Sequence, residues 1–183
     1  MEKSTSKSRP APRQRLIDAA LTLAGREDWR AVGMSAIAEL ARVDLAEALQ
    51  IFRDKSSVIG GYFKNVDAAV LSDLVADGNA GEPAKDRLFD VLMRRFEIMT
   101  PHRDGLAGIV AALPYDPFAG PCRAVHLGRS MALMLEAAGL SSAGCGGMVR
   151  TKGLMVVYLC ALRVWFRDDT ADMAKTMAAL DQS

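Results

Sequence analysis

The feature that most constrains the fold is a pair of short helical segments separated by only three residues. Residues 34–41 and 45–52 each carry apolar side chains at helical spacing, and Arg42, Val43 and Asp44 lie between them. Two helices joined by so short a turn form the helix-turn-helix motif, whose second helix enters the major groove of DNA. The spacing therefore predicts a helix-turn-helix unit over residues 34–52.

Helical periodicity continues through the rest of the chain. Apolar side chains recur three and four residues apart in nearly every segment, which is typical of α-helices rather than of strands. Asp168, Asp169 and Thr170 are expected to cap a last helix, because acids and hydroxyls stabilise helix N-termini. We expect an all-α chain of about nine helices, the others over residues 11–24, 55–76, 84–99, 103–113, 122–138 and 153–166.

The chain divides into a small head and a larger body. We expect a basic tail over residues 1–12, a helix-turn-helix domain over 13–64 and a helical-bundle body over 65–183, with a Gly/Pro-rich break at 78–83 and a glycine-rich loop at 139–147. Residues 1–64 contain 11 Lys/Arg and 8 Asp/Glu, whereas residues 65–183 contain 12 and 14. A mildly basic head on a mildly acidic body suits a DNA-binding end. The alternative is chance variation plus a basic tail.

Composition and motifs exclude several classes of protein. The three cysteines, Cys122, Cys145 and Cys160, are irregularly spaced and indicate reduced thiols. The start of the chain lacks the apolar core of a secretory signal, and residues 153–166 are shorter than the ~20 residues of a membrane span. No catalytic motif is present, and His102 and His126 lack partners at metal-ligand spacing. We therefore expect a cytoplasmic protein that is not an enzyme and holds no cofactor or metal.

The head has a set of apolar, aromatic and basic residues in and around the helix-turn-helix unit: Trp29, Ile37, Ala38, Ala41, Val43, Phe52 and Lys55. With these residues, the segment 13–64 resembles the N-terminal domain of TetR-family transcriptional regulators. The resemblance implies a three-helix DNA-binding head and a body that holds a ligand pocket and a dimer interface. Lys55 matches a family position that meets a phosphate. The residues expected to contact DNA are Ser35, Arg42, Gln50, Arg53 and Lys55.

The chain departs from the family at several of its DNA-facing positions. Arg42 stands where the family has a turn glycine, and a side chain there predicts strain or a different turn, because glycine adopts positive φ without steric cost. Carboxylates at the start of the recognition helix repel the DNA backbone. The other departures are Gly33 for a capping Thr, Leu49 for a Tyr and Ile51 for a His, and the carboxylates are those of Asp44 and Glu47.

A second resemblance concerns the body. Trp29, the segments 101–105 (Pro-His-Arg-Asp-Gly) and 164–170 (Val-Trp-Phe-Arg-Asp-Asp-Thr), and the pair Leu180 and Asp181 are similar to the lipid-binding accessory protein of ubiquinone biosynthesis. That family has a TetR-like fold and uses its body to hold isoprenoid lipids. The resemblance implies a lipid-binding body on a head that has lost DNA binding.

The body is rich in methionine, an adaptable side chain that suits a pocket closing around an irregular apolar ligand. Filling of the core is the simpler interpretation. Tyr158 could supply one hydrogen bond to a ligand. The predicted pocket comprises Met93, Phe96, Met99, Met131, Met134, Met155 and Tyr158.

Residues 153–166 are apolar on all sides, so a helix here must be covered all round. A second subunit supplies that cover most simply, and the alternative is a monomer with this helix at its centre. The predicted interface comprises Leu154, Tyr158, Leu162, Trp165, Met173 and Met177.

Two functions follow from these patterns, besides a third option of a purely structural partner protein. The first is a homodimeric DNA-binding transcriptional regulator, a repressor, that binds a DNA operator and takes an apolar or lipid-like small molecule in its body. The alternative is a lipid-binding accessory protein on the same fold.

Overall fold

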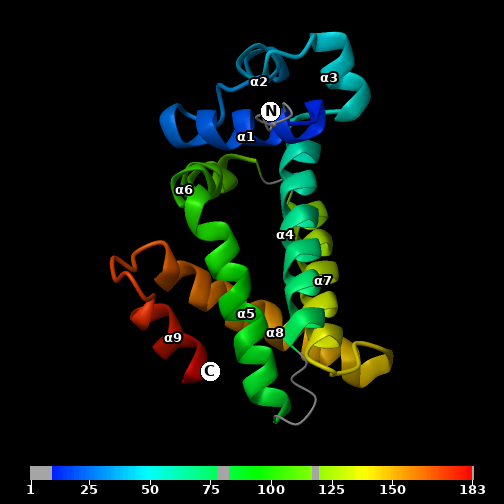
Figure 1. Cartoon of the computed structure of the whole chain (residues 1–183), viewed down its shortest axis with the longest axis vertical. Coiled ribbons are helices and arrows are strands. Elements are labelled where there is room, and N and C mark those ends of the chain that lie inside the picture. Colours follow the sequence, from blue (N-terminus) through cyan, green and yellow to red (C-terminus); the bar gives the residue numbers. More distant parts are fainter. Residues whose placement is uncertain (1–9, 78–82, 117–119, 183) are drawn as a thin grey trace, which may run out of the picture. The chain divides into compact units, whose positions relative to one another are not determined.

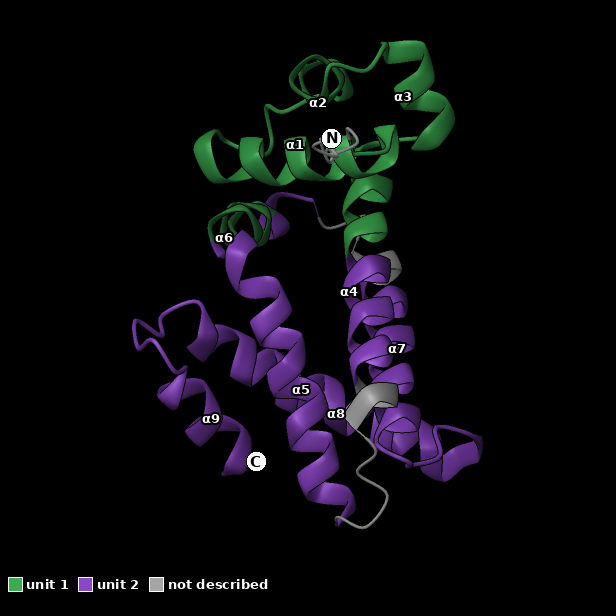
Figure 2. Cartoon of the chain, in the orientation of Figure 1, with its two compact units in different colours: residues 1–62, 104–112 green, residues 63–103, 113–183 purple. Residues whose placement is uncertain are grey.

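The computed structural model describes residues 10–77, 83–116 and 120–182 of the chain, which are helical almost throughout and contain no strand (Figure 1). Residues 1–9 of the expected tail and most of the expected break at 78–83 lie outside the described residues. The described residues form two compact units (Figure 2). Each unit has a core of its own.

Unit 1 comprises residues 10–62 and 104–112. Its helices are α1 (Pro12–Arg26), α2 (Met34–Ala41), α3 (Leu45–Ile51), the first residues of α4 (Lys55–Asp77) and nearly all of α6 (Arg103–Ala112). The helix-turn-helix segments therefore have the predicted boundaries to within one residue. Apolar side chains from these helices are buried against one another, namely Leu16, Ile17, Ala20, Ile37, Ala38, Ala48, Phe52, Val58 and Leu106.

Helix α6 packs directly on the backbone of α1. A Cβ added to Gly105 would lie 2.4 Å from the carbonyl oxygen of Leu21, and one added to Gly108 would lie 1.9 Å from that of Ala24. Only glycine permits so close an approach. Helix α1 continues to Arg26, two residues beyond the expected end at residue 24. The sequence division had placed residues 104–112 in the body, whereas the structure groups them with the head.

Unit 2 comprises residues 63–103 and 113–182. After the remainder of α4 come α5 (Ala84–Met99), η1 (Thr100–His102), η2 (Leu113–Tyr115), α7 (Gly120–Ala137), α8 (Gly144–Trp165) and α9 (Ala174–Asp181). Helix α8 packs on α7 and α9, and α5 packs on α7. The core side chains include Val66, Val91, Leu92, Phe96, Met99, Met131, Met134, Leu135, Leu154, Tyr158 and Trp165.

Helix α8 begins earlier than predicted. The glycine-rich segment expected to be a loop supplies its first turn, where Gly144 has φ +69° and a Cβ on Gly147 would lie 2.0 Å from the carbonyl carbon of Ser142. The helix is therefore 22 residues long, and by length and composition alone it could cross a membrane. Its residues Leu154 and Trp165 are nevertheless buried in the core of unit 2.

Helix α9 is capped by two residues that lie four and six positions before its first residue, Thr170 and Asp168. The buried Asp168 carboxylate accepts hydrogen bonds from the Thr176 N–H at 2.8 Å and the Thr176 hydroxyl at 2.7 Å, and Thr170 Oγ1 accepts from the Ala174 N–H at 2.9 Å. Burial alone would raise the pKa of Asp168, but these bonds and those from Thr170 hold it well below its ordinary value. The predicted capping residues thus act on a helix that starts at Ala174.

Candidate nucleic-acid interface

The turn between α2 and α3 keeps the geometry that a glycine would give it. Arg42 has φ 53° and ψ 48°, and its N–H donates to the Glu39 carbonyl at 3.0 Å. Arg15 donates from Nη1 to the carbonyls of Ala41 and Arg42 at 2.9 and 3.0 Å. The sequence predicts either strain or a different turn at Arg42, and the structure shows the first. Arg42 adopts the left-handed conformation, which costs a residue with a side chain about 1–2 kcal/mol.

The carboxylates at the start of α3 have a structural role. Asp44 is the N-cap residue, and its side chain accepts a hydrogen bond from the Ala46 N–H at 2.8 Å. Glu47 lies in the first turn, where the helix dipole favours a negative charge. Helix α2 has no such cap, because Gly33 at its N-cap position lacks a hydroxyl. The acids therefore stabilise the recognition helix.

Helix α3 exposes an uncharged surface apart from Glu47. Ala48 is fully buried, whereas Ala46 and Gln50 are exposed. Leu45 and Leu49 are also exposed, at 42% and 46%. No lysine or arginine lies within the helix.

Four of the five residues expected to contact DNA are exposed: Ser35, Arg42, Gln50 and Arg53. Arg42 lies two residues before the capping Asp44, and Arg53 follows the last turn of α3. The Arg53 side chain is 94% exposed, and its Nε lies 3.6 Å from a carboxylate oxygen of Asp54. Two arginines thus bracket the recognition helix in the sequence, one at each end.

Lys55, also expected to contact DNA, binds backbone carbonyls of the head. Its Nζ donates to the carbonyls of Trp29, Val32 and Arg30 at 2.7, 2.9 and 3.3 Å, and it lies 5.1 Å from the centre of the Trp29 ring. An ammonium group has three donors, so these carbonyls occupy all of them. Lys55 therefore ties the loop before α2 to the start of α4.

The predicted pocket residues form part of the core of unit 2. Six of them are buried and Met155 is half-buried. The Phe96 ring stacks on that of Tyr158, with centroids 5.4 Å apart, and lies 5.6 Å from that of Trp165. In this state the predicted pocket is a packed cluster.

A buried charged group, missed at the sequence level, lies beside this cluster. Arg95 is 1% exposed, forms an ion pair with Asp67, and donates from Nε to the Tyr158 hydroxyl at 3.2 Å. Ser130 donates to the same Asp67 carboxylate at 2.7 Å. The four residues come from α5, α4, α8 and α7. A signal was present, since Arg95 lies on the apolar stripe of α5, beside Phe96.

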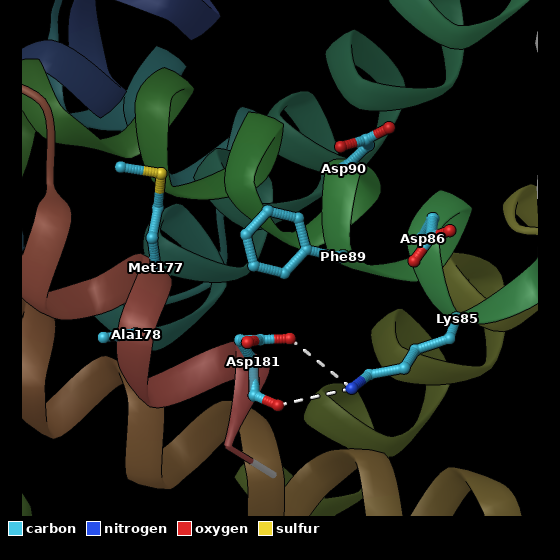
Figure 3. Close-up of a pocket in the computed structure, with 7 residues that line it drawn as sticks. All are labelled: Lys85, Asp86, Phe89, Asp90, Met177, Ala178 and Asp181. Carbon is cyan, nitrogen blue, oxygen red and sulfur yellow. Dashed lines mark hydrogen bonds and ion pairs between the residues drawn. The ribbon is translucent and has the colours of Figure 1, made fainter.

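Two of the hollows among the described residues lie in unit 2. One, of about 480 Å³, lies between α5 and α9 (Figure 3), where Lys85 pairs with Asp181 at 3.5 Å. The other, of about 360 Å³, is lined by Glu97, Thr100, Arg103, Asp168, Asp169, Thr170, Ala171 and Met173. Neither is lined by the predicted pocket residues. Within the described residues, no three or more His, Cys, Asp or Glu side chains converge as metal ligands would.

The two body segments that resemble the ubiquinone-biosynthesis protein meet in the structure. The Arg103 guanidinium lies over the Trp165 ring, 4.7 Å from its centre, and donates to the Asp168 carbonyl at 2.5 Å. These contacts join Arg103, the residue after η1, to the end of α8 and to the segment that follows it. They give both segments a structural role.

Most of the predicted dimer interface points into unit 2. Leu154, Tyr158, Trp165 and Met173 are buried within the single chain, and only Leu162 and Met177 are half-buried. The opposite face of α8 is exposed and mixes apolar with basic side chains. Its exposed residues include Met148, Val149, Val156, Leu159 and Cys160, together with Lys152 and Arg163.

Comparisons with known proteins identify the fold. No family model matches the sequence, and no curated protein matches it. Among solved structures, a TetR transcriptional regulator from Nitrosomonas europaea superposes with a TM-score of 0.73 at 23% identity, covering 93% of this chain and 94% of that one. A TetR regulator from Rhodococcus sp. RHA1 gives 0.61 at 16% identity, over 93% and 94%. Thermus thermophilus FadR, a TetR-family repressor in complex with lauroyl-CoA, gives 0.61 at 18% identity, over 93% and 90%.

The helix-turn-helix head and the helical body therefore define a two-part, all-helical protein. Its fold is that of the TetR-family transcriptional regulators.

Proposed function

We propose that this chain is a cytoplasmic transcriptional regulator, a repressor, that binds a DNA operator as a homodimer. The observation that carries the proposal is the intact helix-turn-helix, whose turn is preserved by the left-handed conformation of Arg42. That turn sets α3 against α2 in the arrangement that places a recognition helix in the major groove. The similarity of the fold to solved TetR regulators supports the same function.

Arg42 and Arg53 supply the electrostatic part of DNA binding. Both are exposed, and they bracket α3 in the sequence. Arginines in such positions contact phosphates and fix the register of the helix on the duplex. Each phosphate that is neutralised releases counterions, so affinity falls as salt rises.

A second copy of the chain covers the open face of α8. Val149, Val156 and Leu159 are 71%, 63% and 48% exposed, and Val125 and Leu133 of α7 are also exposed. A two-fold dimer that buries this face places two identical patches against each other. Paired heads would then reach two half-sites about one helical turn apart.

An apolar ligand with one polar group would regulate the protein from within unit 2. Thermus thermophilus FadR, of the same fold, is bound to lauroyl-CoA. In the present chain, methionines around Phe96 can repack because their side chains are unbranched. Arg95 and Tyr158 would supply the polar contact. Binding would shift the population between DNA-competent and DNA-incompetent states.

Fluorescence anisotropy tests the DNA-binding function. The purified chain is titrated onto a labelled duplex from upstream of its own coding region and onto a scrambled duplex, at two salt concentrations. We expect tighter binding to the upstream duplex at both. Equal affinity for the two duplexes, in the non-specific range of ~10⁻⁴–10⁻⁶ M, would refute it. Arg53→Gln should weaken binding, and Arg167→Gln, an exposed arginine of unit 2, is the matched control.

A lipid-binding accessory protein without DNA binding is the second candidate. The net charge of residues 34–52 favours this candidate. The segment contains one cationic residue, Arg42, and three acidic residues, Glu39, Asp44 and Glu47. Mass spectrometry of an organic extract of the purified protein tests this candidate. It predicts a co-purified lipid that is lost in the Met134→Trp variant, together with no DNA binding.

A further inference from the structure

The recognition helix lacks the residues that read guanine. The commonest specific contact in the major groove is arginine or lysine to the O6 and N7 atoms of guanine. Helix α3 contains neither residue. Its base contacts must therefore come from its uncharged side chains and from Glu47.

The geometry of α3 identifies those side chains. Successive residues are rotated by about 100° around a helix, so Ala46 and Gln50 lie on the side opposite the buried Ala48. Leu45 and Leu49 flank this pair on one side, and Glu47 flanks it on the other. All five are exposed. The outward face of α3 is thus one amide with a methyl group beside it, two leucines on one flank and the Glu47 carboxylate on the other.

These groups match an A·T base pair. A glutamine amide makes two hydrogen bonds with adenine N6 and N7, and apolar side chains contact the C5-methyl group of thymine. Gln50 and Leu49 are adjacent, and Ala46 lies one turn before Gln50. The same small face can therefore contact both members of one pair or of neighbouring pairs.

We propose that α3 reads A·T base pairs, with Gln50 on adenine and Ala46 and Leu49 on thymine methyl groups. The proposal rests on the DNA-binding function proposed above. Arg42 and Arg53 hold phosphates at the two ends of the helix and add affinity without sequence preference. The operator half-sites thus have A·T pairs at the positions that Gln50, Ala46 and Leu49 contact.

Selection from a random library tests the proposal. The full chain is incubated at low salt with duplexes that contain about 30 randomised base pairs, enough for two half-sites, and the bound fraction is sequenced. The enriched duplex is then remade with deoxyuridine in place of thymidine, which removes only the C5-methyl group. We expect enriched A·T pairs and about a fourfold loss of affinity for each contacted methyl.

Variants locate the contacts. In the Leu49→Ala variant, replacing thymidine with deoxyuridine should lower the affinity less than it does in the wild type. The thymine methyl group has then already lost its contact with the leucine side chain. Gln50→Ala should relax the preference for adenine. Leu40→Ala is the matched control, since Leu40 is equally exposed, at 46%, but lies on α2. It should leave the deoxyuridine effect unchanged.

The outcomes separate the two proposals. Enrichment of G·C pairs at the core positions, or equal affinity for thymidine and deoxyuridine duplexes, overturns the A·T reading and leaves DNA binding intact. No enrichment, with affinity independent of sequence, overturns both. An unchanged deoxyuridine effect in Leu49→Ala overturns the role of that residue.

Discussion

The Nζ of Lys55 lies 2.7 Å from the carbonyl oxygen of Trp29 and 5.1 Å from the centre of its ring. This one residue pair joins the start of α4 to the loop that precedes the helix-turn-helix. A charged side chain, which the family resemblance implies to be a phosphate contact, therefore holds this loop to the start of α4.

Replacing Lys55 with Met should lower the free energy of unfolding by about 1–3 kcal/mol, because the loop carbonyls lose charged hydrogen bonds. Urea denaturation measures the change, and Lys64→Met, an exposed lysine on the same helix, is the control. Unchanged stability, together with weaker DNA binding and a smaller salt slope, would instead make Lys55 a phosphate contact.

Replacing Arg42 with Gly should raise stability by about 1 kcal/mol, because glycine adopts φ 53° without the steric cost of a side chain. The same change should reduce the slope of log K against log salt by about one, since one phosphate contact is lost. Thermal unfolding and anisotropy measure the two effects. Arg53→Gln separates them, because it should change the slope and leave stability unaltered. A less stable Arg42→Gly variant would contradict the left-handed turn.

Replacing Asp67 with Ala should destabilise the protein by about 3–5 kcal/mol, because Arg95 is left buried without its counter-charge. The double variant Asp67→Leu, Arg95→Met should recover most of that loss, since no buried charge remains. A double-mutant cycle in urea gives the coupling energy. Additive effects of the two changes would show that the pair does not interact.

Replacing Gly108 with Ala should disrupt the packing of α6 on α1, because the new Cβ would lie 1.9 Å from the Ala24 carbonyl oxygen. Hydrogen exchange should show faster exchange in both helices. Gly60→Ala is the control, since a Cβ there meets nothing within 4 Å, and it should stabilise α4 by up to about 1 kcal/mol. Equal protection in both variants would mean that α6 does not need glycine at this position.

Replacing Val156 with Asp should convert the dimer to a monomer, because it places two carboxylates in an apolar interface. Sedimentation velocity measures the assembly state. Val110→Asp changes an exposed valine of α6 and should leave the dimer intact. A wild-type chain that sediments as a monomer would refute the interface on α8.

Features that depend on interactions between neighbouring residues could be predicted from the sequence, whereas features that depend on residues far apart in the chain could not. Helices α2 and α3 were located to within one residue because their ends depend on neighbouring residues, such as the turn at Arg42 and the cap at Asp44. The burial of Arg95 depends on Asp67, 28 residues away in another helix. No local pattern contains that partner.

The same distinction explains the other differences. Lys55 binds carbonyls 23 to 26 residues earlier in the chain, so its role depends on tertiary structure. Residues 153–166, expected to be helical and apolar all round, are helical as far as Trp165 and include the exposed Arg163. Which face of α8 enters the core is decided by α7 and α9, and that choice left Val156 rather than Trp165 exposed.

The most direct test of the central claim is the salt dependence of DNA affinity for the wild type and for the double variant Arg42→Gln, Arg53→Gln. Anisotropy with the upstream duplex, between about 50 and 200 mM salt, gives the slope for each protein. DNA binding through the helix-turn-helix predicts that the double variant loses about two units of slope and binds more weakly. Identical slopes and affinities for the two proteins would show that this surface does not bind DNA.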